Sequence, residues 1–183
     1  MSGYDREKWI YVPDFYTDYR YILGTRGVRP LICIGINPST AEPDRLDNTL
    51  KSVDRISSGN GFDSFIMFNV YAQRATDPND MHIIPDMGLH RKNMEAFDSL
   101  LDEIKQPALW AAWGTIIEKR PYLPDMVSEM ISIGERHDAR WYCAGNCSKA
   151  GHPHHPLYLK KDEKIKEFNI KEYIGLLKVK GNG

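Results

Sequence analysis

The chain has 183 residues, 42% of them hydrophobic and 27% charged, which is typical of a globular protein and allows one domain, residues 1–183, with a sizeable core. The formal net charge is -1 at pH 7, so the molecule as a whole has no strong field for a polyanion. This balance argues against a dedicated binder of duplex nucleic acid, although a few local Lys and Arg side chains can still hold phosphates.

The sequence predicts a cytoplasmic protein with no membrane partner. No apolar run approaches the roughly 20 residues that cross a bilayer, and the amino terminus, MSGYDREKWIYV, lacks the apolar centre of a signal peptide. The odd number of cysteines, Cys33, Cys143 and Cys147, favours reduced thiols over a disulfide framework. Cys33 is predicted to be a small core residue inside an apolar strand.

The first half of the chain predicts three strands and one helix. Residues 19–23 (YRYIL) alternate bulky and polar side chains, and GTRGVRP then predicts a turn before the apolar strand that ends at Ile36. Residues 49–58 have apolar side chains at helical spacing and end at GNG. The next strong strand is 64–71 (SFIMFNVY), and the long loop 72–88 that follows it is of a length that is often functional.

The second half of the chain predicts two more strands and further helices. In order, we expect a helix over 88–103, a buried strand over 108–113, one or two helices over 115–136 interrupted near Pro121 and Pro124, a short strand over 140–144, and a last helix over about 162–177. The loop GNCSKAGHPHHPLYL precedes that last helix.

Alternating strands and helices predict a three-layer α/β/α domain. We expect a central, mainly parallel four-stranded sheet with an N-terminal antiparallel edge strand. In such a sheet the carboxyl ends of the strands share one edge, where ligands bind. GINPST, the 69–77 loop, the WG pair and the HPHHP loop each follow a predicted strand, so we expect them to form one pocket.

Four motifs in this order resemble the uracil-DNA glycosylase superfamily over residues 31–159. GINPS is similar to the GINPG motif of the mismatch-specific thymine and uracil branch, and FNVYAQRATDPND resembles NVxKxRPPxNR of the bacterial thermostable branch. LWAAWGTIIEKR is similar to the LxLGxxAxxxL strand and helix, and HHPLYL stands where the superfamily has HPS. Over nearly the whole chain, YRYxL, NPSTA, DNT, NVYAxRATDP, AAWG and GHPxHPLYL resemble more closely a bacterial and phage domain family of unknown function.

The resemblance implies an N-glycosidase of the DNA-repair type, acting on a nucleobase in DNA, RNA or a nucleotide. Asn37 would position water, Asn69 would read the base, and His155 would stabilise the departing base. An amide orients water but does not deprotonate it, so Asp47 is a candidate for the missing base. The tyrosine and histidine of the fast enzymes are replaced by Ser39 and Thr40, which predicts a slow or unusual reaction. The iron–sulfur cysteine pattern is absent, and we expect no cofactor.

The expected substrate-binding residues follow from the same motifs. Leu157 and Tyr158 stand where the superfamily carries an apolar wedge, Tyr71 is a candidate for stacking on a base, and Arg74 for binding a phosphate. The full set is Gly35, Ile36, Pro38, Ser39, Asn69, Tyr71, Arg74, Pro156, Leu157 and Tyr158.

Each polar candidate also has a purely structural interpretation. Asn37 can cap its own Asn-Pro turn, and Asp47 can be the N-cap of the helix that follows. Asn69 can bond local backbone, while Arg74 can pair with Asp77 or anchor its loop.

Two further functions remain open on sequence grounds. One is a nucleotide or modified-base binding module without catalysis. The other is a metal-dependent hydrolase that uses Asp44, Asp47 and the loop histidines. The Cys and His cluster that suggests a metal has a spacing that matches no standard zinc unit, so we expect no metal; it comprises Cys143, Cys147, His152, His154 and His155. No protein partner is evident.

Overall fold

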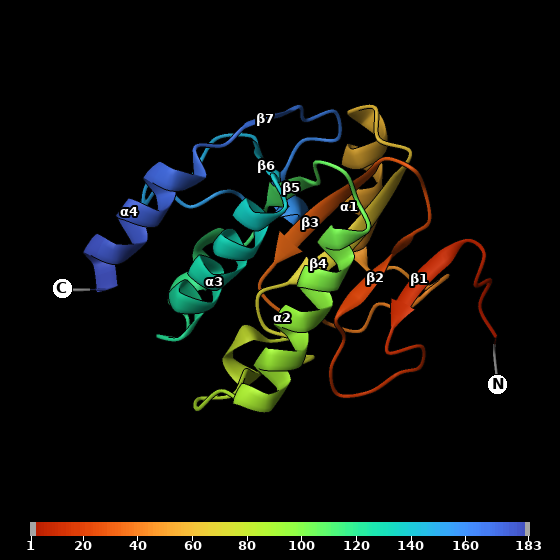
Figure 1. The fold of residues 1–183 in the computed structure, drawn as a ribbon, viewed down its shortest axis with the longest axis horizontal. Coiled ribbons are helices and arrows are strands. Elements are labelled where there is room, and N and C mark those ends of the chain that lie inside the picture. The colour runs from red at the N-terminus through yellow and green to blue at the C-terminus, as the bar shows by residue number, and fades with distance from the viewer. Residues whose placement is uncertain (1–2, 182–183) are drawn as a thin grey trace.

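The computed structural model describes residues 3–181, which form a seven-stranded sheet with four α-helices (Figure 1). The sheet has the order β1-β2-β4-β3-β5-β6-β7. Its strands are β1 (Trp9–Val12), β2 (Ile22–Thr25), β3 (Pro30–Gly35), β4 (Ser64–Asn69), β5 (Ala108–Ala111), β6 (Arg140–Ala144) and β7 (Ile165–Glu167).

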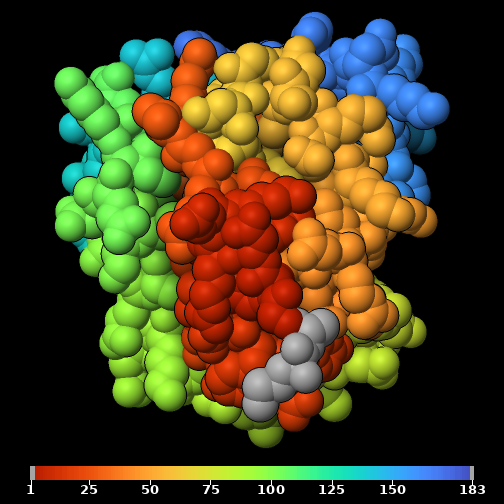
Figure 2. Space-filling view, turned by 90° about the vertical axis from the view of Figure 1, so that its right-hand side faces the viewer, coloured from red at the N-terminus to blue at the C-terminus, as the bar shows by residue number. Residues whose placement is uncertain are grey.

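The sheet is larger than the predicted four strands and one edge strand. Its centre, β4-β3-β5-β6, is parallel as expected, but β1 and β2 add two antiparallel strands on one side and β7 adds a third beside β6. β1 is a short apolar run of four residues, WIYV, directly after a charged segment, and β7 has three residues that are only partly buried or exposed. Neither of these short strands was predicted. Figure 2 shows the N-terminal residues, in red, spread over the β1 edge of the molecule.

Helices cover both faces of the sheet. On one face, α1 (Asn48–Gly59) packs its apolar side against β3 and β4. On the other face, α2 (Met87–Asp102) and α3 (Leu123–Arg136) cover the alternate residues of the same strands, and α4 (Ile170–Gly181) lies against α3 (Figure 1). Cys33 is fully buried on the α1 face, which confirms it as a core residue.

Most predicted elements begin and end within two residues of the observed ones, but three regions differ: the last helix, the 115–136 segment and the strand predicted over 19–23. The last helix begins at Ile170 rather than near residue 162, because β7 occupies part of that segment. The predicted 115–136 segment divides into the 3-10 helix η2 (Gly114–Glu118) and α3. None of the helices within residues 3–181 has the length and apolar content needed to cross a bilayer.

Gly24 is in a strand and not in the predicted turn. It lies in β2, opposite Ile66 of β4. A Cβ atom on Gly24 would stand 2.3 Å from the carbonyl oxygen of Phe65, closer than any packed structure tolerates. The observed strand begins at Ile22 and ends at Thr25, so it overlaps the predicted strand, 19–23, only at residues 22–23, and Tyr19 makes only an isolated bridge to Gln73.

Candidate functional site

The carboxyl ends of the four parallel strands bring the predicted site loops together. The chain leaves β3 toward β4 on one side and reaches β5 on the other, so the β3/β5 crevice is the point at which strand order reverses. The loops on this edge are joined by hydrogen bonds. Asn37 Nδ2 donates to Ala75 O at 2.7 Å, and Gly114 N donates to Pro153 O at 2.9 Å.

Asn37 holds two loops together through its amide nitrogen. Nδ2 donates to the carbonyl oxygens of Ala75 and, at 3.1 Å, of Pro38. These bonds fix the side chain and leave Oδ1 without a hydrogen bond from the residues described. The free Oδ1 atom can accept a hydrogen bond from water, whereas Nδ2 is already committed to the loop.

Asn69 is a buried amide with no hydrogen-bond partner for either polar atom. The residue is 1% exposed, and neither Nδ2 nor Oδ1 is satisfied within residues 3–181. Its side chain faces the backbone of Gly35, where a Cβ atom would stand 3.1 Å from Asn69 Oδ1. Its position is fixed because Asn93 Nδ2 donates to the Asn69 carbonyl oxygen at 2.9 Å. A buried amide left unpaired costs about 1–3 kcal/mol, so Asn69 remains a candidate ligand-binding residue.

His155 is held as a neutral imidazole at the start of the 3-10 helix η3 (Pro156–Tyr158). Its Nδ1 atom accepts from Leu157 N at 3.2 Å, so the proton of the neutral ring resides on Nε2. Burial lowers the pKa of His155, and the Asp47 carboxylate partly opposes that shift. Gly114, with a φ of 60°, allows the β5 loop to approach the His155 side chain closely.

Acidification is expected to destabilise the fold through His155. Because its pKa is lower in the folded than in the unfolded chain, the unfolded chain binds the proton first as the pH falls below about 6.5. The stabilising contribution of neutral His155 is therefore complete above that pH and is lost as the pH falls through the folded pKa. Urea unfolding at pH 7.5 and 5.5 measures this loss.

The matched variant for this measurement is His155→Asn, which retains an acceptor for Leu157 N. We expect its free energy of unfolding to fall less between the two pH values than that of the unmodified protein. Equal losses in both proteins would mean that His155 is not held neutral by burial.

The two aspartates of the AEPDRLDNT segment have structural partners. Asp47 is the N-cap of α1, where its Oδ1 accepts from Leu50 N at 2.9 Å. Asp44 Oδ1 accepts from the indole Nε1 of Trp9 at 3.0 Å. The negative charge of Asp47 also acts to raise the pKa of both His155 and Arg20.

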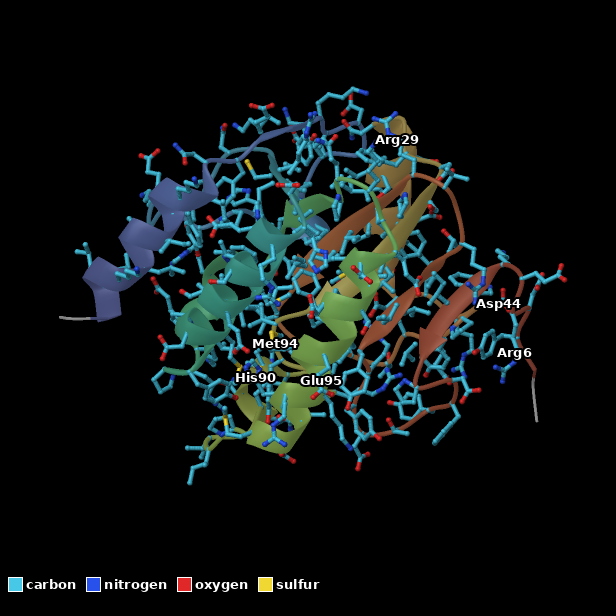
Figure 3. The ribbon with its side chains drawn as sticks, in the orientation of Figure 1. Arg6, Arg29, Asp44, His90, Met94 and Glu95 are labelled. Atoms are coloured by element: carbon cyan, nitrogen blue, oxygen red, sulfur yellow. The ribbon has the colours of Figure 1, made fainter. Side chains whose placement is uncertain are left out.

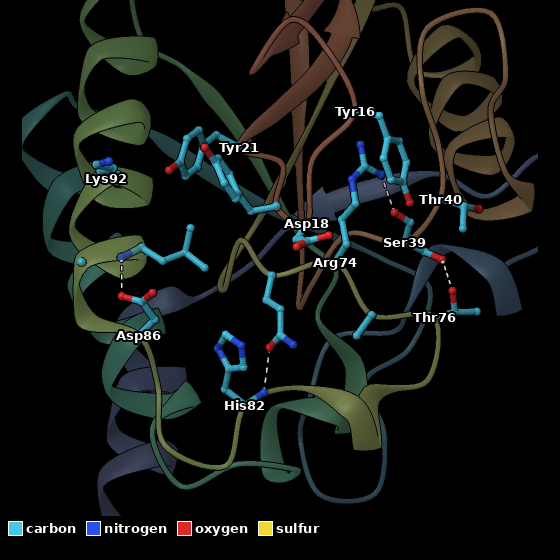
Figure 4. A pocket seen from close by; sticks show the side chains of 15 residues that line it. Tyr16, Asp18, Tyr21, Ser39, Thr40, Arg74, Thr76, His82, Asp86 and Lys92 are labelled. Carbon is cyan, nitrogen blue, oxygen red and sulfur yellow. Dashed lines mark hydrogen bonds between the residues drawn. The ribbon is translucent and has the colours of Figure 1, made fainter.

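A cavity of about 710 Å³ lies beside the loops that follow β3 and β4 and is lined by two of the predicted residues, Ser39 and Arg74 (Figure 4). The guanidinium of Arg74 lies over the ring of Tyr16, 4.1 Å from its centroid. Two further tyrosines, Tyr19 and Tyr21, contribute to the lining. A volume of this size is within the range of small-molecule sites, about 300–1,000 Å³. Asn37, Asn69 and His155 lie outside its lining.

The other predicted site residues divide between the interior and the surface. Tyr71 is fully buried, and its hydroxyl bonds His82 Nδ1 at 2.6 Å and accepts from Asp86 N at 2.9 Å, so it supports the cavity wall from behind. Leu157 and Tyr158 are 45% and 80% exposed beside α1. Gly35, Ile36, Pro38 and Pro156 are buried.

In the HPHHP loop, His152 takes part in a buried hydrogen-bond network. Within residues 3–181 no three His, Cys, Asp or Glu side chains are placed to hold a metal ion. His152 is fully buried, with Nδ1 2.7 Å from the Tyr173 hydroxyl and Nε2 2.8 Å from Glu118 Oε1. The Trp113 indole donates to the same hydroxyl at 2.8 Å. This network ties the loop to α4.

Sequence reasoning missed Arg20, which is 1% exposed and donates to Ala41 O at 3.1 Å. The YRYIL pattern predicts a strand, and the alternation of bulky and polar residues puts Arg20 on the polar face of that strand. A charged residue in an otherwise bulky segment was the available signal. Tyr16 and Tyr19 were missed as cavity residues because they reach the site from the N-terminal part of the chain.

Comparisons with known proteins identify the family but no activity. A search of curated proteins and a search of solved structures gave no match. One family model, described as "Protein of unknown function (DUF1643)", matches residues 20–157, which include the strand-end loops and the residues Arg20 and Arg74. The chain therefore belongs to this DUF1643 family of proteins of unknown function.

Proposed function

We propose that the protein is an N-glycosidase that cleaves the bond between a nucleobase and its sugar. The observation that carries this proposal is the buried, unpaired amide of Asn69. Its adjacent donor and acceptor match the donor and acceptor on the edge of a pyrimidine or a related modified base. The resemblance of GINPS, the Asn69 segment, WG and HHPLYL to the uracil-DNA glycosylase superfamily supports the same reaction.

In the proposed reaction the base enters between the strand-end loops and pairs with Asn69. Because Asn69 is 1% exposed, these loops have to part, and the base has to leave its stack first. The glycosidic bond breaks with its electron pair moving to the base, and His155 Nε2 donates a hydrogen bond to the developing anion. Asn37 Oδ1 orients a water molecule toward the anomeric carbon. That water loses its proton to solvent as the new C–O bond forms.

Loss of Asn69 is expected to abolish base release. Asn69→Ala removes both hydrogen bonds to the base, and Asn37→Ala removes the acceptor for water, so each is expected to lower kcat/KM by about 10²-fold or more. The measurement is release of free base from a panel of normal and modified nucleobases in single-stranded DNA, duplex DNA, RNA and nucleotides.

The matched control is Asn146→Ala, an exposed asparagine with no side-chain hydrogen bond to the residues described. It is expected to leave base release unchanged. Circular dichroism of each variant separates lost chemistry from lost folding. If the unmodified protein releases no base from any member of the panel, the glycosidase proposal is wrong.

One observation favours a second candidate, a binding module for a nucleotide or modified base. The candidate general base, Asp47, already has a structural role, since its Oδ1 accepts from Leu50 N as the N-cap of α1. A site with a base-reading amide and no base catalyst suits recognition without turnover. Binding of a base that is never released, abolished by Asn69→Ala, would favour this candidate.

A further inference from the structure

Two arginines, Arg20 and Arg74, lie side by side at the loop that follows β3. Arg20 and Arg74 both donate to the carbonyl oxygen of Ala41, at 3.1 and 3.2 Å. Arg74 also donates to Ser39 O and, at 2.8 Å, to the Tyr11 hydroxyl. Neither guanidinium forms an ion pair with a carboxylate of the described chain, residues 3–181. Carbonyl oxygens, the Tyr11 hydroxyl and the Tyr16 ring contact these two positive charges, and the Asp47 carboxylate acts on Arg20 without forming an ion pair with it.

This arrangement is electrostatically unfavourable in the absence of an anion. Burial, and next the charge of Arg74, lower the pKa of Arg20 to about 10, so the side chain remains charged at pH 7. The Nε atoms of both arginines are buried and have no hydrogen-bond partner within residues 3–181. A buried charge without an ionic partner is rarely retained for stability alone. An anion held nearby would offset the repulsion.

The cavity next to Arg74 offers the groups that bind such an anion. Three hydroxyl side chains, Ser39, Thr40 and Thr76, line the same end as Arg74 (Figure 4). Ser39 Oγ and Thr76 Oγ1 lie 3.2 Å apart and join the loop after β3 to the loop after β4. Hydroxyl groups and arginine together are the usual protein partners of phosphate oxygens.

We infer that this end of the cavity binds the phosphate monoester of a mononucleotide beside Arg74, Ser39 and Thr76. The buried guanidinium of Arg20, which shares the Ala41 carbonyl oxygen with Arg74, adds its positive charge to this site. The inference rests on the proposed function, for which it names the substrate class. A phosphate monoester carries about two negative charges at pH 7, which matches two arginines. A polyanionic backbone fits less well, because the chain has a net charge of -1 and two carboxylates, Asp18 and Asp86, line the same cavity.

Titration calorimetry of the full chain tests the inference. The ligands are inorganic phosphate, the 5′-monophosphates of adenosine, guanosine, cytidine, uridine and thymidine, the five nucleosides, and an oligonucleotide with internal diesters only. We expect at least one monophosphate to bind ten or more times tighter than its nucleoside. Tighter binding of the oligonucleotide than of every monophosphate would show that the phosphate comes from a nucleic-acid backbone and would overturn the inference.

Two variants and one control locate the phosphate. Arg20→Met keeps an unbranched side chain as far as the position of Nε and removes the buried charge, and Thr76→Val removes one exposed hydroxyl without disturbing the core. Each is expected to weaken monophosphate binding at least fivefold while nucleoside binding stays unchanged. The control, Arg29→Met, lies at the amino-terminal edge of the sheet, away from these strand ends (Figure 3), and should have no effect. Unchanged binding in a folded Arg20→Met and in Thr76→Val would overturn the inference.

A third variant separates this inference from the glycosidase proposal. Asn69→Ala is expected to retain phosphate binding because Asn69 lies outside the cavity lining. Phosphate-dependent binding without any base release would leave the inference standing and remove the glycosidase. Base release that is equally efficient from nucleosides and monophosphates would leave the glycosidase proposal standing and overturn the inference of a phosphate site.

Discussion

Gly24→Ala is expected to lower the free energy of unfolding by about 3 kcal/mol or more, one of the largest effects of a single methyl group in this chain. The added Cβ would stand 2.3 Å from Phe65 O and 2.7 Å from Ile66 Cα, both of which are backbone atoms of β4. Backbone cannot turn away as a flexible side chain can. The antiparallel pairing of β2 with β4 would have to open. In the described sheet β1 is the edge strand and pairs with β2, so it would be displaced together with β2.

The control for this substitution is Gly175→Ala in α4. A Cβ atom at Gly175 meets nothing within 4 Å, and alanine is favoured over glycine in a helix, so we expect a gain of about 0.5–1 kcal/mol. Urea unfolding of both variants gives the comparison. A Gly24→Ala protein within 1 kcal/mol of the unmodified chain would mean that β2 does not lie this close to β4.

The parallel centre of the fold is predictable because its strands carry continuous apolar runs. LICIG and SFIMF are buried on both faces by helices, and such strands have a strong signal in a single sequence. The first helix is equally clear, since Asp47 caps it where an aspartate precedes an apolar helical pattern. The edges were not predictable in this way. β1 and β7 have three or four residues each and depend on tertiary pairing.

The candidate site was likewise predictable only in part. The rule that parallel strands end on one edge was enough to predict that the loops carrying Asn37, Asn69 and His155 follow strand ends on the same edge of the sheet. It does not give the direction of a side chain, so it did not reveal that Asn37 Nδ2 binds Ala75 O or that Asn69 is unpaired. Arg20 and the tyrosine wall come from a distant segment of the sequence. Their role follows from tertiary contacts, which no local pattern encodes.

Tyr173→Phe is expected to lower the free energy of unfolding by about 3 kcal/mol through the loss of one oxygen atom. The Tyr173 hydroxyl accepts from Trp113 Nε1 at 2.8 Å and donates to His152 Nδ1 at 2.7 Å, leaving the His152 Nε2 proton for Glu118. Trp113 and His152 are both fully buried. Removal of the hydroxyl leaves a buried donor and a buried acceptor without partners, at about 1–3 kcal/mol for each group.

Thermal and urea unfolding measure the loss, and Tyr142→Phe is the matched control. Tyr142 is half-buried and its hydroxyl has no hydrogen bond to the residues described, so its loss is expected to cost less than about 0.5 kcal/mol. Equal effects of the two substitutions would contradict the network.

Hydrogen exchange then shows which part of the molecule depends on this hydroxyl. Tyr173 joins α4 to the loop of residues 151–155, and that loop also contacts the β5 end through the bond from Gly114 N to Pro153 O. In Tyr173→Phe we expect faster amide exchange in α4 and in this loop, with β3 and β4 unchanged. His155 is the last residue of the same loop. Faster exchange in both segments would therefore show that α4 helps to position His155 in the candidate site. Faster exchange in α4 alone would show that it does not.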